Sequence, residues 1–189
     1  PVQEIISTPN PDKMKRYNTL LLLAGLAVAF TAVAQVNPKL QAKLEQEAAA
    51  IEQKTIQWRR TFHQQPELSN MEVKTAAIVA EHLRKLGLDV KTGVARTGVV
   101  AVLNTGKPGP VVALRADMDA LPVEERNELP FASKERVVYN GRETGVMHAC
   151  GHDSHMAILM AVAEGLVKNK ADLKGQIKFI FQPADRKST

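Results

Sequence analysis

The chain has 189 residues, a single cysteine and a formal net charge of +5 at pH 7. A length of this order suits one domain or most of one, and one cysteine excludes an intramolecular disulfide. The positive surplus is modest, and no arginine-rich stripe with interleaved aromatic residues accompanies it. The composition therefore gives no support to a nucleic-acid-binding protein.

The N-terminal region has the features of an export leader. A basic start is followed by an apolar run over residues 20–30, and the small residues Ala32-Val33-Ala34 suit signal-peptide cleavage. The run is shorter than the ~18 residues expected of a membrane span. We expect an upstream extension over residues 1–13, a signal peptide over residues 14–34 and a mature start at Gln35. The protein would then be secreted or periplasmic, without a stable membrane span; a signal anchor is the alternative.

Apolar residues at three- and four-residue steps predict an amphipathic helix from Leu40 to Phe62. Pro66 should end this helix, because the residue before a proline is pushed away from helical angles. His63, near the helix end, is more typical of a packing or hydrogen-bonding histidine than of a metal ligand.

A second helix is predicted to start at a capping box formed by Ser69 and Glu72 and to stop at Gly87. Val73, Ala76, Ala80 and Leu83 would give it a buried face. His82 lies among charged residues of this helix and is expected to face solvent without a function.

Short apolar runs predict strands at residues 88–92, 99–103, 111–115 and 176–181, with a helix over residues 156–168. The second and third runs are continuously apolar, which favours strands covered on both faces. Helices flanking such strands indicate an α/β three-layer sandwich. Functional sites of these sheets cluster beyond the carboxyl ends of the strands.

The densest group of potential ligands lies within residues 148–155, which hold three imidazoles, one thiol and one carboxylate. Thiolate and imidazole are the donors that zinc and similar divalent metals select. Cys150 and His152 do not share a helix face, but side chains two apart point the same way in an extended backbone. Asp153 or Ser154 is a candidate N-cap. We therefore expect a metal-binding loop that leads into a helix.

Three other interpretations of this loop remain open. A structural zinc module would need four closed ligands, which His148, Cys150, His152 and His155 supply only in a strained loop. A thiol enzyme would use Cys150 with His152, but it lacks a resolving cysteine and an assignable triad partner. Exposed loop histidines beside a small buried Cys150 are the plainest alternative.

Acidic residues after the third strand divide into two groups. Asp117 is expected to orient a ligand histidine or to hold charge near the metals, whereas Asp119 stays open between that role and an ordinary loop carboxylate. Glu124, Glu125 and Glu128 lie among arginines and are typical of a solvated face.

Residues 148–153, with the sequence HACGHD, resemble the signature of the amidohydrolase branch of the aminoacylase/carboxypeptidase metallopeptidases. This branch includes hippurate hydrolases, N-acyl-amino-acid amidohydrolases and plant indole-acetyl-amino-acid hydrolases. Three further segments are similar in the expected order: an opening motif at residues 59–69, a strand-end aspartate motif at 115–122 and the start of a fourth motif at 182–184. The resemblance spans about residues 51–184.

The resemblance implies a three-layer α/β/α sandwich of the zinc-exopeptidase type. Residues 35–189 would be the N-terminal part of its catalytic domain, without the lid or dimerisation domain, so a homodimer is expected only of a full-length form. The implied reaction is hydrolysis of the amide bond of N-acyl or N-aroyl amino acids or small peptides. Two divalent ions, zinc, manganese, cobalt or nickel, would serve as cofactors.

Carried over by position, the resemblance makes Cys150 and His152 metal ligands and places Asp117 in the catalytic site. Asp185 stands at the position of the general base, where the family has a glutamate. Arg186 replaces a ligand glutamate, and a permanently charged guanidinium cannot ligate a cation. We therefore expect an inactive fragment of an amidohydrolase; the alternative is a non-catalytic, truncated metal-binding protein.

Overall fold

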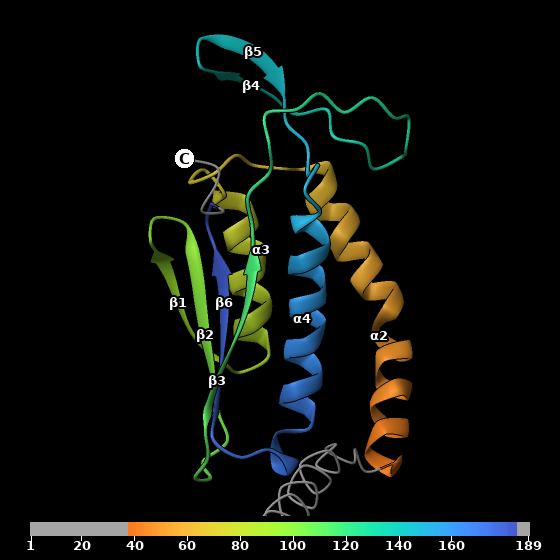
Figure 1. Cartoon of the computed structure of the whole chain (residues 1–189), viewed down its shortest axis with the longest axis vertical. Helices are drawn as coiled ribbons and strands as arrows, with labels where there is room; N and C mark the ends of the chain where they lie inside the picture. Colours follow the sequence, from red (N-terminus) through yellow and green to blue (C-terminus); the bar gives the residue numbers. More distant parts are fainter. Residues whose placement is uncertain (1–37, 185–189) are drawn as a thin grey trace, which may run out of the picture. The chain divides into compact units, whose positions relative to one another are not determined.

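The computed structural model describes residues 38–184 (Figure 1). The helices are α2 (Pro38–Gln64), α3 (Val73–Lys85) and α4 (His152–Lys168), and the 3-10 helix η1 (Lys170–Asp172) follows α4. The strands are β1 (Asp89–Val94), β2 (Gly98–Asn104), β3 (Val111–Asp117), β4 (Arg136–Tyr139), β5 (Arg142–Gly145) and β6 (Gln176–Gln182). The chain divides into two units after Gln41, and the fold described below belongs to the second. Within residues 38–184, no helix is both long and apolar enough to cross a membrane.

Four strands form one mixed sheet in the order β1-β2-β6-β3. β1 and β6 run antiparallel to β2, whereas β3 and β6 are parallel and joined through α4. Because β3 and β6 pair in parallel, their carboxyl ends meet at one edge, where Asp117 is the register partner of Gln182. α4 starts at this same edge (Figure 1). The predicted edge of the sheet is therefore confirmed as the place where the motif-bearing segments converge.

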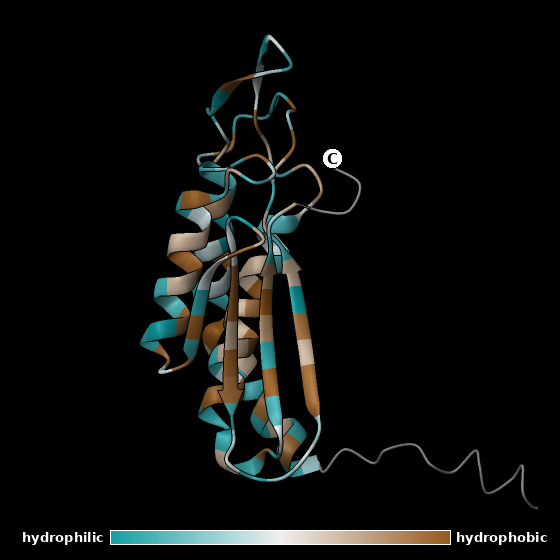
Figure 2. Cartoon of the chain, turned by 90° about the vertical axis from the view of Figure 1, so that its left-hand side faces the viewer, coloured by the Kyte–Doolittle hydropathy of each residue, from teal (hydrophilic) through white to brown (hydrophobic). Residues whose placement is uncertain are grey.

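The core lies between the sheet and helices α3 and α4. α3 packs on β1 and β2, and α4 packs on β3 and β6. Every second residue of the central strands is buried, as expected for one covered face; these residues are Val99, Ala101, Leu103, Ile177, Phe179 and Phe181. Figures 1 and 2 both show the helices on one side of the sheet.

The α/β class is confirmed. The prediction that the third strand is covered on both faces is wrong among the described residues. Val111 and Val112 of β3 are 59% and 48% exposed. The reason is position, since β3 is an outer strand of the sheet and the helices cover only one face.

The N-terminus of α3 is capped from a distance. The Glu67 carboxylate accepts the backbone N–H of Lys74 at 3.1 Å and that of Thr75 at 2.8 Å. The predicted capping box is wrong, because Ser69 donates its hydroxyl to Asp119 at 2.8 Å instead. The predicted end of this helix is confirmed: α3 stops at Lys85, and Gly87 follows with a φ of 77°.

Glu72, the other half of the predicted capping box, turns into the protein and is fully buried. Its Oε1 accepts the backbone N–H of Ala184 at 3.1 Å, and its Oε2 accepts the hydroxyl of Thr97. Glu72 therefore ties the start of α3 to the turn that follows β6.

The first helix is confirmed, and it ends at Gln64, before Pro66. α4 begins at His152 with Gly151 as its N-cap, so the prediction of Asp153 or Ser154 as N-cap is wrong. Gly151 has a φ of 82°, a left-handed conformation that glycine adopts without a Cβ penalty.

The prediction that His82 faces solvent is wrong. Its side chain is 11% exposed, its ring lies 4.7 Å from that of Trp58, and Nε2 lies 3.3 Å from the carbonyl oxygen of Met160. Burial is the main cause that lowers the pKa of His82. The expectation failed because the histidine side chain is covered by residues of α2 and α4.

Candidate metal and catalytic site

Three potential metal ligands meet at the edge where β3 ends and α4 begins. Asp117 closes β3, and His152 and His155 lie in the first turn of α4. One donor atom from each of these side chains lies within 4.8 Å of the other two. Asp117 and His152 were predicted for the site. His155 was considered only for a structural zinc module, although its spacing of three from His152 on a helix could have identified it.

His152 is held in one orientation by Asp119. Its Nδ1 lies 2.8 Å from the carbonyl oxygen and 3.0 Å from Oδ1 of Asp119. Because both atoms only accept, Nδ1 of the neutral ring carries the proton and Nε2 keeps the lone pair. Metal-binding histidines typically donate their other ring N–H to a carboxylate or a carbonyl oxygen. The side-chain hydrogen bond to Asp119 is also the main cause that raises the pKa of His152.

The structure divides the roles predicted for Asp117. The contact that orients His152 belongs to Asp119, which the sequence left open between such a role and an ordinary loop carboxylate. Asp117 instead places a carboxylate beside His152 and His155, as its second predicted role requires. Nη2 of Arg115 lies 2.7 Å and 2.9 Å from the two carboxylate oxygens of Asp117.

Cys150 lies on the turn before α4 and is exposed, whereas His152 is 4% exposed. The two side chains therefore occupy different surroundings, with the left-handed Gly151 between them. Within residues 38–184, the single group of three or more close metal-ligating side chains contains neither Cys150 nor His148. The four-ligand zinc module gains no support, and ligation by Cys150 stays a prediction.

His148 is buried, and neither of its ring nitrogens has a hydrogen-bond partner among residues 38–184. It is 4% exposed. Burial is the main cause that lowers its pKa to about 4, and the nearby Asp153 opposes this effect. His148 is thus a neutral imidazole at neutral pH.

A polar network lies behind the first turn of α4. Oδ2 of the fully buried Asp153 accepts from Nε of Arg59 at 3.0 Å and lies 2.8 Å from Nδ1 of His63. The other nitrogen of His63, Nε2, lies 2.9 Å from Oε1 of Glu125. The interpretation of His63 as a hydrogen-bonding histidine is confirmed. The network connects α2, α4 and the loop before β4.

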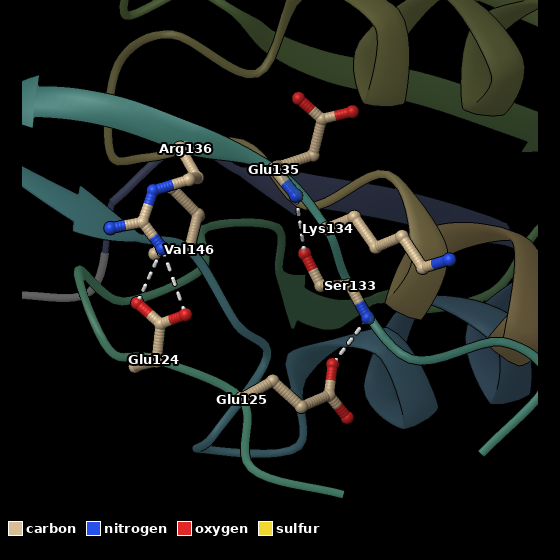
Figure 3. A pocket seen from close by; sticks show the side chains of 8 residues that line it. Glu124, Glu125, Ser133, Lys134, Glu135, Arg136 and Val146 are labelled. Carbon is tan, nitrogen blue, oxygen red and sulfur yellow. Dashed lines mark hydrogen bonds and ion pairs between the residues drawn. The ribbon is translucent and has the colours of Figure 1, made fainter. Parts of the chain in front are cut away.

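Glu125 was wrongly assigned to a solvated face, because its side chain is only 1% exposed. Burial acts to raise the pKa of Glu125, but hydrogen bonds from His63 and the backbone of Ser133 lower it overall. In Figure 3 its carboxylate faces the chain at Ser133. Glu124 is exposed as predicted, and Arg136 binds both of its carboxylate oxygens at 2.9 Å.

Asp185, the predicted general base, lies outside the described residues, as do Arg186 and the predicted leader. The structure does describe the residues that directly precede Asp185. Gln182 ends β6 beside Asp117, its backbone carbonyl accepts the N–H of Met118 at 2.9 Å, and Ala184 is held by Glu72.

The donor set suits a divalent transition metal. Two imidazole nitrogens and one carboxylate are ligands that zinc, manganese, cobalt and nickel accept, and three protein ligands leave positions for water or substrate. The preset orientation of His152 by Asp119 adds to this fit. The α/β fold and this donor set are together typical of a domain that binds a divalent metal ion at the carboxyl edge of its sheet.

Comparison with known proteins shows what the chain is similar to. Residues 113–185 match the model of Peptidase family M20/M25/M40. It is 52% identical over 144 residues to Thermostable carboxypeptidase 1 of Saccharolobus solfataricus, covering 76% of this chain and 35% of that protein. It is 46% identical over 130 residues to N-acyl-L-amino acid amidohydrolase of Geobacillus stearothermophilus, covering 69% and 33%. The predicted resemblance is confirmed.

A solved structure is also similar to this chain. The YXEP protein of Bacillus subtilis, described as a dinuclear metal binding peptidase from the M20 family, matches with a TM-score of 0.65 and 41% identity. The match covers 72% of this chain and 36% of that protein. The chain therefore spans about a third of the length of the relatives that it matches.

Proposed function

We propose that this chain is part of a metal-dependent amidohydrolase that cleaves the amide bond of N-acyl or N-aroyl amino acids or of small peptides. The observation that carries the proposal is the Asp119-bound His152 beside Asp117 at the carboxyl edge of the sheet. The names of the relatives, a carboxypeptidase and an N-acyl-amino-acid amidohydrolase, support this substrate class.

The residues of this chain would prepare the site in three ways. Asp119 fixes the His152 ring, Asp117 contributes negative charge, and Cys150 would add a thiolate ligand. When bound, two divalent ions, zinc, manganese, cobalt or nickel, supply polarisation of the amide carbonyl and a more acidic water. The dinuclear metal binding of the YXEP protein supports the number of ions.

The proton transfer would fall to the position of Asp185. A carboxylate there would take a proton from the attacking water and pass it to the leaving amine. Aspartate is one methylene shorter than the glutamate of the family, and a misplacement of ~1 Å can cost about a hundredfold in rate. Arg186 adds a positive charge where an anionic ligand is expected. We therefore propose that the 189-residue chain is itself inactive.

The first experiment measures metal and activity together. Purified chain carrying Cys150→Ser or His152→Ala should hold less zinc, manganese or cobalt by elemental analysis than the unchanged chain. Unaltered metal content in both variants would contradict the proposed ligands. The unchanged chain should not hydrolyse N-acetyl or N-benzoyl amino acids with any of these ions. Metal-dependent turnover that Cys150→Ala abolishes would instead show that the site is active as it stands.

The predicted leader supports a proposal on location, namely a secreted or periplasmic protein. The mature protein should start at Gln35, which the intact mass of the exported chain would reveal. A mature protein that retains residues 20–30 would favour a membrane anchor.

A further inference from the structure

We propose that Asp117, His152 and His155 form a site for one divalent first-row transition-metal ion that does not need Cys150, and that Arg115 competes with the ion for Asp117. The inference rests on the proposed metal-dependent function and deepens it. It adds His155, which the sequence motifs did not assign to a cocatalytic centre, and it gives Arg115 a role.

The geometry of α4 brings two of the three ligands together. His152 and His155 are three residues apart in its first turn, so their side chains lie on the same face of the helix. Their ring centroids are 5.4 Å apart with an interplanar angle of 35°. Asp117 reaches the same place from the end of β3, and donor atoms of all three residues lie within 4.8 Å of one another.

The tautomer of His152 is already set for metal binding. The two contacts between Asp119 and His152 both involve Nδ1 of His152, so Nε2 is the ring nitrogen left to bind an ion. Such a partner fixes the ring and raises the basicity of the ligand. His155 is exposed, which gives an ion from solvent a route to the site. The site thus combines a buried, oriented ligand, His152, with an exposed one, His155.

Carboxylates near the first turn of α4 supply negative charge for a cation. The N-terminus of a helix carries a partial positive charge that disfavours a cation, so an ion here needs nearby anions. Asp119 and Asp153 are buried carboxylates close to the first turn of α4. The carboxylate of Asp117 is the third anion near this turn. The guanidinium of Arg115 binds both oxygens of Asp117. Its side chain is 47% exposed, so it can leave the carboxylate when an ion arrives.

The two groups therefore compete for one carboxylate. An ion and a guanidinium cannot both use the two oxygens of Asp117 at full strength, and their like charges repel each other. Removing Arg115 should strengthen ion binding, whereas removing His155 should weaken it. A gain of affinity is informative because misfolding does not produce it.

The experiment is a cobalt titration of the metal-free 189-residue chain, followed by calorimetry and visible absorption. All test variants carry Cys150→Ser, so that no thiolate contributes and only the proposed site is counted. This background should bind one cobalt ion per chain and lack the thiolate charge-transfer band. Adding His155→Asn should weaken binding about tenfold or more, in the range seen when support of a metal site is lost. Adding Arg115→Gln should strengthen it several-fold.

His82→Asn is the matched control, since His82 lies on α3 outside the site, and it should leave the cobalt affinity unchanged. If the unchanged chain binds cobalt but the Cys150→Ser background does not, the three-ligand site is overturned while a Cys150-dependent centre stands. A His155→Asn variant with unaltered affinity would also overturn it. If no form of the chain binds cobalt, both this site and the proposed function fail.

Discussion

His63 and Asp153 are joined across 90 residues of sequence by a contact of 2.8 Å between Nδ1 and Oδ2. The contact connects the end of α2 to the first turn of α4, next to the candidate ligand His152. Asp153 has no exposed surface and also binds Arg59. A buried charge that loses its partners is costly, so this pair should matter for stability.

Asp153→Asn is expected to lower the free energy of unfolding by about 3–5 kcal/mol, the range for breaking a buried ion pair. Urea unfolding followed by circular dichroism would measure the loss. Lys85→Ala is the control, because Lys85 pairs with Glu81 on an exposed helix surface, and it should leave the midpoint unchanged. Equal midpoints for the two variants would show that the Asp153 contacts do not stabilise the fold.

Asp119→Ala should weaken metal binding about 10- to 100-fold without removing a ligand. The reason is the loss of the carboxylate contact that fixes Nδ1 of His152. Calorimetric titration with zinc or cobalt gives the affinity, and the unfolding midpoint shows whether the fold is retained. Asp119→Asn keeps an oxygen that can accept the same hydrogen bond and should restore part of the affinity. A metal affinity that is unaltered in Asp119→Ala would remove Asp119 from the site.

Glu67→Ala should destabilise the chain by about 1 kcal/mol, the typical value for a lost helix cap. Its carboxylate accepts the backbone N–H groups of Lys74 and Thr75 at the start of α3. Thermal or urea unfolding measures the change, and Glu128→Ala, an exposed loop carboxylate, serves as the comparison. Protection from hydrogen exchange should fall first in the opening turn of α3; a uniform loss along the helix would argue against a capping role.

The stability of the chain should fall with pH below about 6.5 through His82. Burial, the main cause, lowers the pKa of His82 from its ordinary value of 6.5. The unfolded state therefore takes up a proton first as the pH falls, and the folded state loses stability from pH 6.5 down to the lowered pKa. The ion pair with Glu164 at 3.8 Å opposes but does not reverse this effect. Urea midpoints between pH 7.5 and 5.5 should decrease less in His82→Gln than in the unchanged chain; parallel decreases would contradict the assignment.

Local sequence signals predicted the main elements because these depend on periodicity. The helices, the four sheet strands and the edge bearing Asp117 and His152 followed from apolar patterns and from strand direction. The hairpin of β4 and β5 was missed, since its strands have four residues each and β5, with the sequence RETG, has no apolar side chain. Its turn did carry a signal, as Asn140-Gly141 favours a two-residue hairpin turn, and both residues have positive φ.

The sequence alone could not predict which of two similar acidic side chains has a role in the site. Nothing local distinguishes Asp119 from Asp117, or Glu125 from Glu124, because their roles depend on partners far along the chain. Asp119 meets His152 across 33 residues, and Glu125 meets His63 across 62. These contacts exist only after the helices have packed on the sheet, so pattern and spacing could not assign them.

The position of β6 has a consequence for the order in which this chain can fold during its synthesis. β6 lies between β2 and β3, so the last described strand to leave the ribosome is the one that joins the two earlier parts of the sheet. Until Phe179 and Phe181 emerge, the β1–β2 hairpin and β3 have no shared neighbouring strand, and their apolar faces are not yet fully packed. Pairings over such sequence distances form slowly, and exposed strands are prone to aggregate meanwhile. Nascent chains stalled before Gln176 should therefore depend on chaperones, while those stalled well beyond Gln182 should be released from them.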